Sequence, residues 1–117
     1  MIKVYGIKQC DTMKKAFTWL NEKNIPYDFH DYKKADLAPA TFVNWLNQAD
    51  TGVLINRRGT TWRKLSADQQ AACDSGDAEQ IAAVAVANSS VIKRPVVETE
   101  NGLLVGFNAA QWTEHFA

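Results

Sequence analysis

The first 32 residues hold the pattern that most restricts the fold of this chain. Apolar residues predict one strand at 2–5 and a second, alternating strand at 25–32. Between them, apolar residues at helical spacing predict a helix over about 11–23, which Asn24 and Pro26 end. The apolar face of this helix comprises Met13, Ala16, Phe17 and Leu20. A strand, a helix and a strand in this order form a βαβ unit, which implies parallel pairing and a right-handed crossover.

The middle of the chain predicts helices that are separated by breaks. Pro39 suits a first helical turn, and the apolar residues after it share one face: Phe42, Trp45 and Leu46. After Thr51 and Gly52 interrupt this pattern, the apolar residues 53–55 are too few to classify. Residues 56–64 are rich in cations and predict a loop. Two capping-box patterns then predict the starts of two helices: Ser66 with Gln69, and Asp77 with Gln80.

The last third of the chain predicts a return to strands. Strands are expected at 92–99 and 103–107, joined by a hairpin turn at Asn101-Gly102. Asn108 is expected to cap a final helix, which carries Trp112 and Phe116. The order of elements resembles a thioredoxin-type domain, which implies an α/β, thioredoxin-like (glutaredoxin-type) fold with a mixed four-stranded sheet in the order 4-3-1-2. A helical insertion at about 38–90 would separate the βαβ and ββα halves of a single domain, 1–117.

Composition and charge restrict the partners of the chain. Its 117 residues suffice for one domain with one hydrophobic core. Thirteen basic and thirteen acidic residues cancel, so the net charge favours neither nucleic acid nor a membrane surface. No apolar run reaches the ~20 residues of a membrane span, and the N-terminus lacks the pattern of a signal peptide. Two cysteines in this context predict a cytoplasmic protein without disulfides, and we expect a monomer.

Cys10 is the strongest candidate for chemistry. It lies where the first strand passes into the first helix, and the free N–H groups and dipole of a helix start favour a thiolate. Its polar neighbours indicate a position near solvent, and Lys8 and Lys14 add positive potential. The alternative is that Cys10 is a small buried hydrophobe, as most free cysteines are. The position of the residue favours the reactive thiolate.

Cys10 has no second thiol in its motif. Met13 occupies the position at which a C-x-x-C motif would place the resolving cysteine, which excludes an intramolecular dithiol cycle there. Cys73, the other cysteine, lies among small residues near the end of a predicted helix and is interpreted as structural. A partner thiol would therefore come from another molecule, and glutathione is the abundant choice.

Arg94-Pro95 is the second candidate feature. A proline at the start of a central strand is disfavoured unless the backbone needs a special shape, such as a cis bond. In a thioredoxin-type fold this position lies beside the active-site cysteine, where Arg94 would direct its guanidinium group to an anion at Cys10. The alternative is a surface arginine that precedes a strand.

The remaining polar candidates predict mainly structural roles. The cation cluster of residues 57–64 is expected to be a solvated face, of which one or two members could line an anion pocket. This cluster comprises Arg57, Arg58, Arg63 and Lys64. His30 and His115 have neither the cysteine nor the carboxylate spacing of a metal site.

Three separated segments resemble the arsenate reductase (ArsC)/Spx family, in its small YffB-like branch. They are YGIKQCDTMKKA at 5–16, NRRGTTWRKL at 56–65 and KRPVV at 93–97. The resemblance spans essentially the whole chain and implies a thioredoxin-like fold with a helical insertion. It also implies that Cys10 is the nucleophile and that Arg94-Pro95 supplies the anion-binding arginine and the cis-proline.

The chain departs from this family in its cations and in its thiols. Glutathione-dependent arsenate reductases carry a C-terminal arginine that helps to hold the oxyanion, but this chain has no Arg or Lys after Arg94. Asn56 stands in the place of another family arginine, with Arg57 and Arg58 adjacent. Spx-type regulators bind RNA polymerase and commonly carry a C-x-x-C switch, which Met13 removes.

These observations predict a glutathione-dependent thiol reductase that acts through Cys10, with no bound cofactor and no metal. The residues expected to contact the substrate or an anion are Lys8, Arg57, Arg58, Arg94 and Pro95. Glutathione is the expected cosubstrate, and glutaredoxin is a further candidate partner. Two alternatives remain open: an arsenate reductase, and a non-catalytic regulator that binds RNA polymerase.

Overall fold

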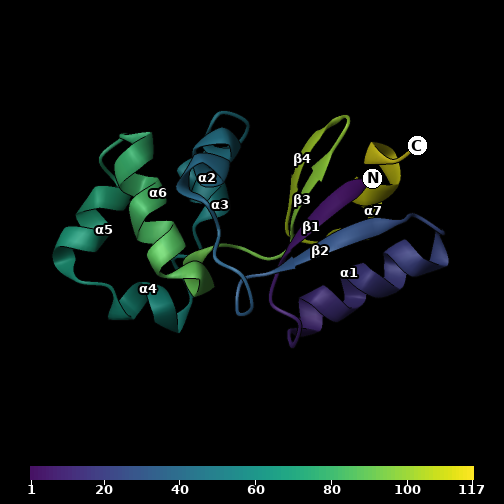
Figure 1. Ribbon diagram of the computed structural model, residues 1–117, viewed down its shortest axis with the longest axis horizontal. Helices are drawn as coiled ribbons and strands as arrows, with labels where there is room; N and C mark the ends of the chain where they lie inside the picture. Colours follow the sequence, from purple (N-terminus) through teal and green to yellow (C-terminus); the bar gives the residue numbers. More distant parts are fainter. The chain divides into compact units, whose positions relative to one another are not determined.

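A four-stranded mixed sheet joins the two ends of the chain (Figure 1). The computed structural model describes residues 1–117. The strands are β1 (Ile2–Gly6), β2 (Tyr27–Asp31), β3 (Val96–Thr99) and β4 (Gly102–Val105). They lie in the order β2-β1-β3-β4, with β1 parallel to β2 and the other neighbouring pairs antiparallel. This order confirms the predicted thioredoxin-like sheet.

Two helices cover one face of the sheet, α1 (Asp11–Glu22) and α7 (Ala109–His115). The buried core between them and the strands comprises Val4, Met13, Ala16, Leu20, Val97, Leu104 and Trp112. The ring of Trp112 contacts the edge of the Trp19 ring at a centroid distance of 5.6 Å, and its Nε1–H donates to the Gly106 carbonyl at 3.2 Å. The two helices therefore pack against each other as well as against the sheet. Asn108 caps α7 through the N–H of Gln111, as predicted.

Residues 36–93 form a second compact unit, while residues 1–35 and 94–117 together form the unit that holds the sheet. The helices of the second unit are α2 (Pro39–Leu46), α3 (Thr51–Leu54), α4 (Thr60–Lys64), α5 (Ala67–Cys73), α6 (Ala78–Ala87) and the 3₁₀ helix η1 (Ser89–Val91). The core of this unit includes the fully buried Phe42 and Trp45 of α2, which packs against α6. A single domain with an insertion at about 38–90 stays a prediction.

Two capped helix starts follow the local sequence. Ser66 Oγ accepts from the Gln69 N–H at 3.1 Å while the Gln69 side chain accepts from the Ser66 N–H at 2.9 Å, which confirms the predicted capping box. Asp77 accepts from the Gln80 N–H at 3.4 Å and begins α6, also as predicted. Both contacts join residues three positions apart, so the sequence alone specifies them.

The predicted loop over 56–64 is wrong in its second half, where Thr60–Lys64 form α4. The carbonyl of Trp62 in this short helix accepts a hydrogen bond from Gln70 Nε2 of α5 at 2.9 Å. The unclassified residues 53–55 divide between α3 and an isolated bridge from Ile55 to Ile92. Both assignments depend on contacts with later parts of the chain, which local patterns do not reveal.

The strand β1 extends one residue beyond the prediction, to Gly6, and the other three strands are shorter than predicted. β2 begins only after Pro26, which has no N–H for a ladder, and the predicted strand at 92–99 begins at Val96. Ile92 instead pairs with Ile55 in the second unit. The hairpin turn is also shifted by one residue: Gly102 pairs with Thr99 and has a φ of 122°, so the two residues before it form the turn.

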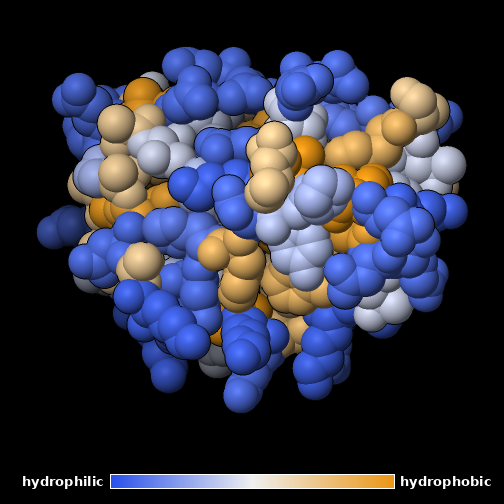
Figure 2. Space-filling model, turned by 45° about the vertical axis from the view of Figure 1, so that its right-hand side comes forward, coloured by the Kyte–Doolittle hydropathy of each residue, from blue (hydrophilic) through white to orange (hydrophobic).

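The face shown in Figure 2 is mostly hydrophilic, with apolar side chains exposed among the polar ones. Met1 and Val53 are the exposed large hydrophobic residues. None of the helices is long and apolar enough to cross a membrane. No group of three or more His, Cys, Asp or Glu side chains is arranged to hold a metal ion.

Candidate active site

The carboxyl end of β1 lies beside a segment that is distant in the sequence. Tyr5 pairs with Val96, so Arg94 and Pro95, which precede Val96, lie next to the place where the chain leaves β1. The peptide bond between Arg94 and Pro95 is cis. The Pro95 carbonyl accepts a hydrogen bond from the Gly106 N–H at 2.8 Å, which ties this segment to the end of β4.

Gly6 and Met13 hold the start of α1 close to the end of β1. A Cβ atom at Gly6 would lie 2.6 Å from Met13 Sδ, well inside van der Waals contact. Met13 is fully buried in the core. Met13, which stands where the second cysteine of a C-x-x-C motif would be, is therefore an apolar core residue that packs on β1.

Cys10 is the N-cap residue of α1. Its extended backbone (φ −144°, ψ 133°) ends where the helix begins, and its carbonyl accepts the first helical hydrogen bond from the Lys14 N–H at 3.0 Å. The thiol is partly exposed and also packs against the core. Cys10 is thus accessible to a reagent while its backbone is fixed by the helix.

The surroundings of Cys10 favour its thiolate. Burial alone raises the pKa of the thiol, but the backbone N–H groups of Met13 and Thr12 act as donors to the sulfur and lower it. The charge of Arg94 and a hydrogen bond from its guanidinium group lower it further, and the net pKa of Cys10 lies below its ordinary value. The positive end of α1 and a remote arginine therefore act on the same sulfur.

Of the predicted site residues, the structure brings Cys10, Arg94 and Pro95 together. Lys8 is exposed and is not among the groups that lower the pKa of Cys10. It lines a groove of about 970 Å³ that runs along the outer edge of the sheet. The lining residues that carry a charge are Lys3, Lys8, Lys14, Asp28, Asp31 and Lys34, and the aromatic ones include Phe17, Tyr27 and Phe29. A contact of Lys8 with the thiolate stays a prediction.

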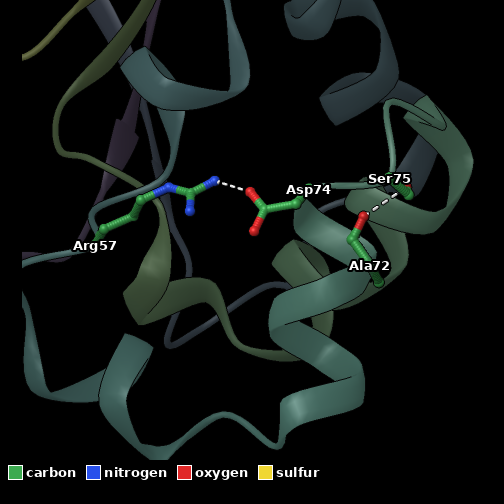
Figure 3. Close-up of polar contacts among 4 residues, drawn as sticks. All are labelled: Arg57, Ala72, Asp74 and Ser75. Atoms are coloured by element: carbon green, nitrogen blue, oxygen red, sulfur yellow. Dashed lines mark hydrogen bonds and ion pairs between the residues drawn. The ribbon is translucent and has the colours of Figure 1, made fainter.

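Arg57 and Arg58 belong to the second unit, and their predicted part in an anion pocket stays a prediction. The Arg57 guanidinium forms an ion pair with Asp74 just after α5, as Figure 3 shows. It also lies over the Trp62 ring, 4.6 Å from the centroid. Arg58 uses its backbone carbonyl to accept a hydrogen bond from the Arg63 side chain at 3.1 Å. Arg57 is therefore engaged by a carboxylate and an aromatic face of its own unit.

Sequence reasoning missed a group of polar residues on the face of the sheet opposite α1. Tyr5 Oη donates to Glu98 Oε1 at 2.8 Å, and the Tyr5 ring contacts that of His30 at 5.2 Å. The His30 ring contacts that of Tyr32 at 6.2 Å. The alternation of the strands assigns these residues to one face, but only the pairing of β1 with β2 and β3 brings them together.

The sheet order, together with a partly exposed cysteine at the start of the first helix and a cis-proline in the neighbouring segment, defines a thioredoxin-like protein. Residues 5–115 match the model of the ArsC family, and the chain belongs to this family.

Known relatives and structures agree with this assignment. The protein YffB (PA3664), whose structure is known, is 40% identical in sequence to this chain; the two structures superpose with a TM-score of 0.91 over the full length of both chains. An arsenate reductase (ArsC) related protein from Brucella melitensis is 43% identical, with a TM-score of 0.71, over 98% of this chain and 93% of that chain. The global transcriptional regulator Spx of Listeria innocua is 28% identical over 92% of this chain and 81% of its own length.

Proposed function

We propose that the protein is a thiol reductase that uses Cys10 as its single nucleophile and glutathione as its cosubstrate. The observation that carries the proposal is the place of Cys10, partly exposed at the N-cap of α1, where two backbone donors and Arg94 lower the pKa of its thiol. A thiolate is the nucleophilic form of cysteine, so this environment suits attack on a disulfide sulfur. We expect the protein to act in the cytoplasm as a monomer, with glutaredoxin as a further candidate partner.

The reaction needs two exchanges. In the first, the Cys10 thiolate attacks the glutathione sulfur of a mixed disulfide, forms a new S–S bond with it and releases the other sulfur as a thiolate, which takes up a proton. In the second, the thiolate of another glutathione attacks the glutathione sulfur on Cys10, forms glutathione disulfide and returns Cys10 as a thiolate. In sum, the mixed disulfide and one free glutathione give the substrate thiol and glutathione disulfide, so one free glutathione is oxidised for each substrate thiol that is released. Because Met13 replaces a resolving cysteine, the second thiol has to come from solution.

Glutathione also fits the charges near Cys10. It has two carboxylates, for which Arg94 and the lysines of the adjacent groove, Lys8, Lys14 and Lys34, are suitable partners. Arg94 would bind the anionic partner, while the groove would receive the rest of the tripeptide.

The proposal is tested with a glutathione-mixed disulfide of a small thiol and excess glutathione. Cys10→Ser should reduce the turnover to the uncatalysed rate, while Cys73→Ser should retain most of the activity because Cys73 is buried. Mass spectrometry should detect one glutathione adduct, on Cys10. Full activity of Cys10→Ser would contradict the proposal.

Two relatives favour other functions that the same assays can separate. The related protein of Brucella melitensis is named for arsenate reductase, and Arg94 beside Cys10 is suitable for an oxyanion. Reduction of arsenate in the presence of glutathione and glutaredoxin would favour this function. The Spx regulators instead favour a transcription-associated binding protein, which recovery of RNA polymerase by a tagged chain with an unreactive Cys10 would support.

A further inference from the structure

We infer that the Tyr32 hydroxyl is a donor for the anionic group that Arg94 binds, and that it completes the substrate site beside Cys10. Tyr32 is 6% exposed, and its hydroxyl has no hydrogen-bond partner. Buried polar groups nearly always have a partner, so an unpartnered hydroxyl in this place requires an explanation. A ligand that is bound only during the reaction would supply the missing acceptor.

The register of the sheet puts Tyr32 at the same end of β1 as the reactive thiol. Gly6, the last residue of β1, pairs with Asp31, and its carbonyl accepts a hydrogen bond from the Tyr32 N–H at 2.9 Å. Arg94 approaches the same end of β1 from its other side, two residues before Val96. Tyr32 and Arg94 therefore flank the segment that leads from β1 to Cys10.

Ring contacts place the Tyr32 side chain on the sheet face that carries the polar network. Its ring contacts that of His30, whose ring contacts that of Tyr5. Tyr5 in turn donates to Glu98, so Tyr5 and Glu98 already satisfy each other. The hydroxyl of Tyr32 is the member of this network whose hydrogen-bonding capacity is unused.

The electrostatics of Tyr32 make it a donor and not a base. Burial and the neighbouring Tyr5 raise the pKa of the Tyr32 hydroxyl, Glu98 raises it further, and the positive charge of Arg94 opposes this rise. The hydroxyl therefore keeps its proton at neutral pH. The effect of the Arg94 charge on the Tyr32 hydroxyl agrees with the strand register, which puts both residues at the same end of β1. Two donors of this kind, one charged and one neutral, suit a carboxylate or another oxyanion.

The inference rests on the proposed function only in requiring that the substrate brings an anionic group to Arg94. It assigns to Tyr32 a positioning role: the hydroxyl orients this group, and the group orients the reacting sulfur toward Cys10. A purely structural Tyr32 would behave differently, because the removal of an unpartnered buried hydroxyl is neutral or stabilising for the fold. Binding and stability thus respond to Tyr32→Phe in different ways.

The test measures how inorganic sulfate protects Cys10 from alkylation by iodoacetamide, at fixed pH and at an ionic strength held constant with chloride. Tyr32→Phe should require roughly tenfold more sulfate for half-protection, since a hydrogen bond to a charged group is lost. Its thermal unfolding temperature should be unchanged or higher. The control is Thr113→Val, which removes an exposed hydroxyl of α7 that donates to the Ala109 carbonyl at 2.8 Å. In this control, half-protection of Cys10 should require the same sulfate concentration as in the wild type.

Several outcomes would overturn the inference: no protection of the wild type by sulfate, equal protection of Tyr32→Phe and wild type, or equal weakening of the protection in Thr113→Val. A parallel series with S-methylglutathione, which cannot form a disulfide, separates the inference from the proposed function. Protection by sulfate alone, lost in Tyr32→Phe, would support the inference and contradict glutathione binding. If S-methylglutathione protects Cys10 equally well in the wild type and in Tyr32→Phe, glutathione binding is supported and the inference about Tyr32 is contradicted.

Discussion

The guanidinium group of Arg94, from the other half of the chain, lowers the pKa of the Cys10 thiol through its positive charge and a hydrogen bond to the sulfur. The two residues come together because Tyr5 of β1 pairs with Val96 of β3, which puts the start of one strand beside the end of the other. A permanently charged guanidinium group next to a thiol stabilises the thiolate and can also bind an anionic substrate. Arg94 therefore has two effects that experiment can separate.

Replacement of Arg94 should change both the nucleophile and the binding of substrate. Arg94→Ala should raise the pKa of Cys10 toward its ordinary value, which the pH dependence of alkylation by iodoacetamide measures. In the mixed-disulfide assay, kcat/KM should fall roughly tenfold to hundredfold, the range expected on loss of a charged hydrogen bond. Arg63→Ala is the control, since Arg63 lies in the second unit. An unchanged pKa of Cys10 in Arg94→Ala would contradict the described geometry.

The stability of the protein should depend on pH through Cys10. Because the folded state lowers the pKa of Cys10, the folded chain releases the thiol proton at a lower pH than the unfolded chain. The resulting stabilisation is fully present above the unfolded pKa and is lost as the pH falls through the folded pKa. The free energy of unfolding of the wild type, relative to Cys10→Ser, should therefore increase from about pH 6 to about pH 9.

Cys73 supplies the opposite control for this pH dependence. Burial raises the pKa of the Cys73 thiol, while attraction to Arg57 opposes the rise and Asp74 adds to it. Its contribution to stability is present below the unfolded pKa and is lost as the pH rises through the folded pKa. Relative to Cys73→Ala, the wild type should therefore become less stable as the pH rises above about 8.5, the ordinary pKa of a thiol. The same sign for both variants would refute the assignment of the two thiols.

Two glycine substitutions should have effects of opposite sign on stability. In Gly6→Ala, the new Cβ would meet Met13 Sδ at 2.6 Å, so the packed core has to shift at a cost of about 1–3 kcal/mol. In Gly52→Ala, the Cβ meets nothing within 4 Å in α3, and the better helix former should stabilise by up to about 1 kcal/mol. Urea denaturation measures both changes. Adding Met13→Ala to Gly6→Ala should cost less than the sum of the two single changes.

The two cysteines should also differ in accessibility. Cys10 is partly exposed with a lowered pKa, whereas Cys73 is 2% exposed with a raised pKa. Mass spectrometry at short times of alkylation at neutral pH should therefore detect label on Cys10 alone. In denaturant both thiols should react at similar rates. Early labelling of Cys73 in the folded protein would show that α5 is open to solvent.

Most of the secondary structure was predictable because its causes are local. Met13, Ala16 and Leu20 recur at the period of a helix, and each is fully buried in α1. The same holds for the caps, whose partners lie three residues away, as in Ser66 with Gln69. The helix α4 was missed because its contact with α5 joins residues that local patterns do not relate. The hairpin was predicted within one residue: the turn lies at residues 100 and 101, and Gly102, which has a positive φ, already pairs with Thr99.

The sequence by itself determined the βαβ and ββα halves, the position of Cys10 at the start of a helix and the absence of a second thiol at Met13. These features depend on residues a few positions apart, whose spacing is visible in the chain. Only the tertiary structure decided that Arg94 contacts Cys10 and that Tyr32 is buried without a partner at the same end of β1. Both relations depend on the register of β1 with β2 and β3, which is a property of long-range pairing and not of local sequence.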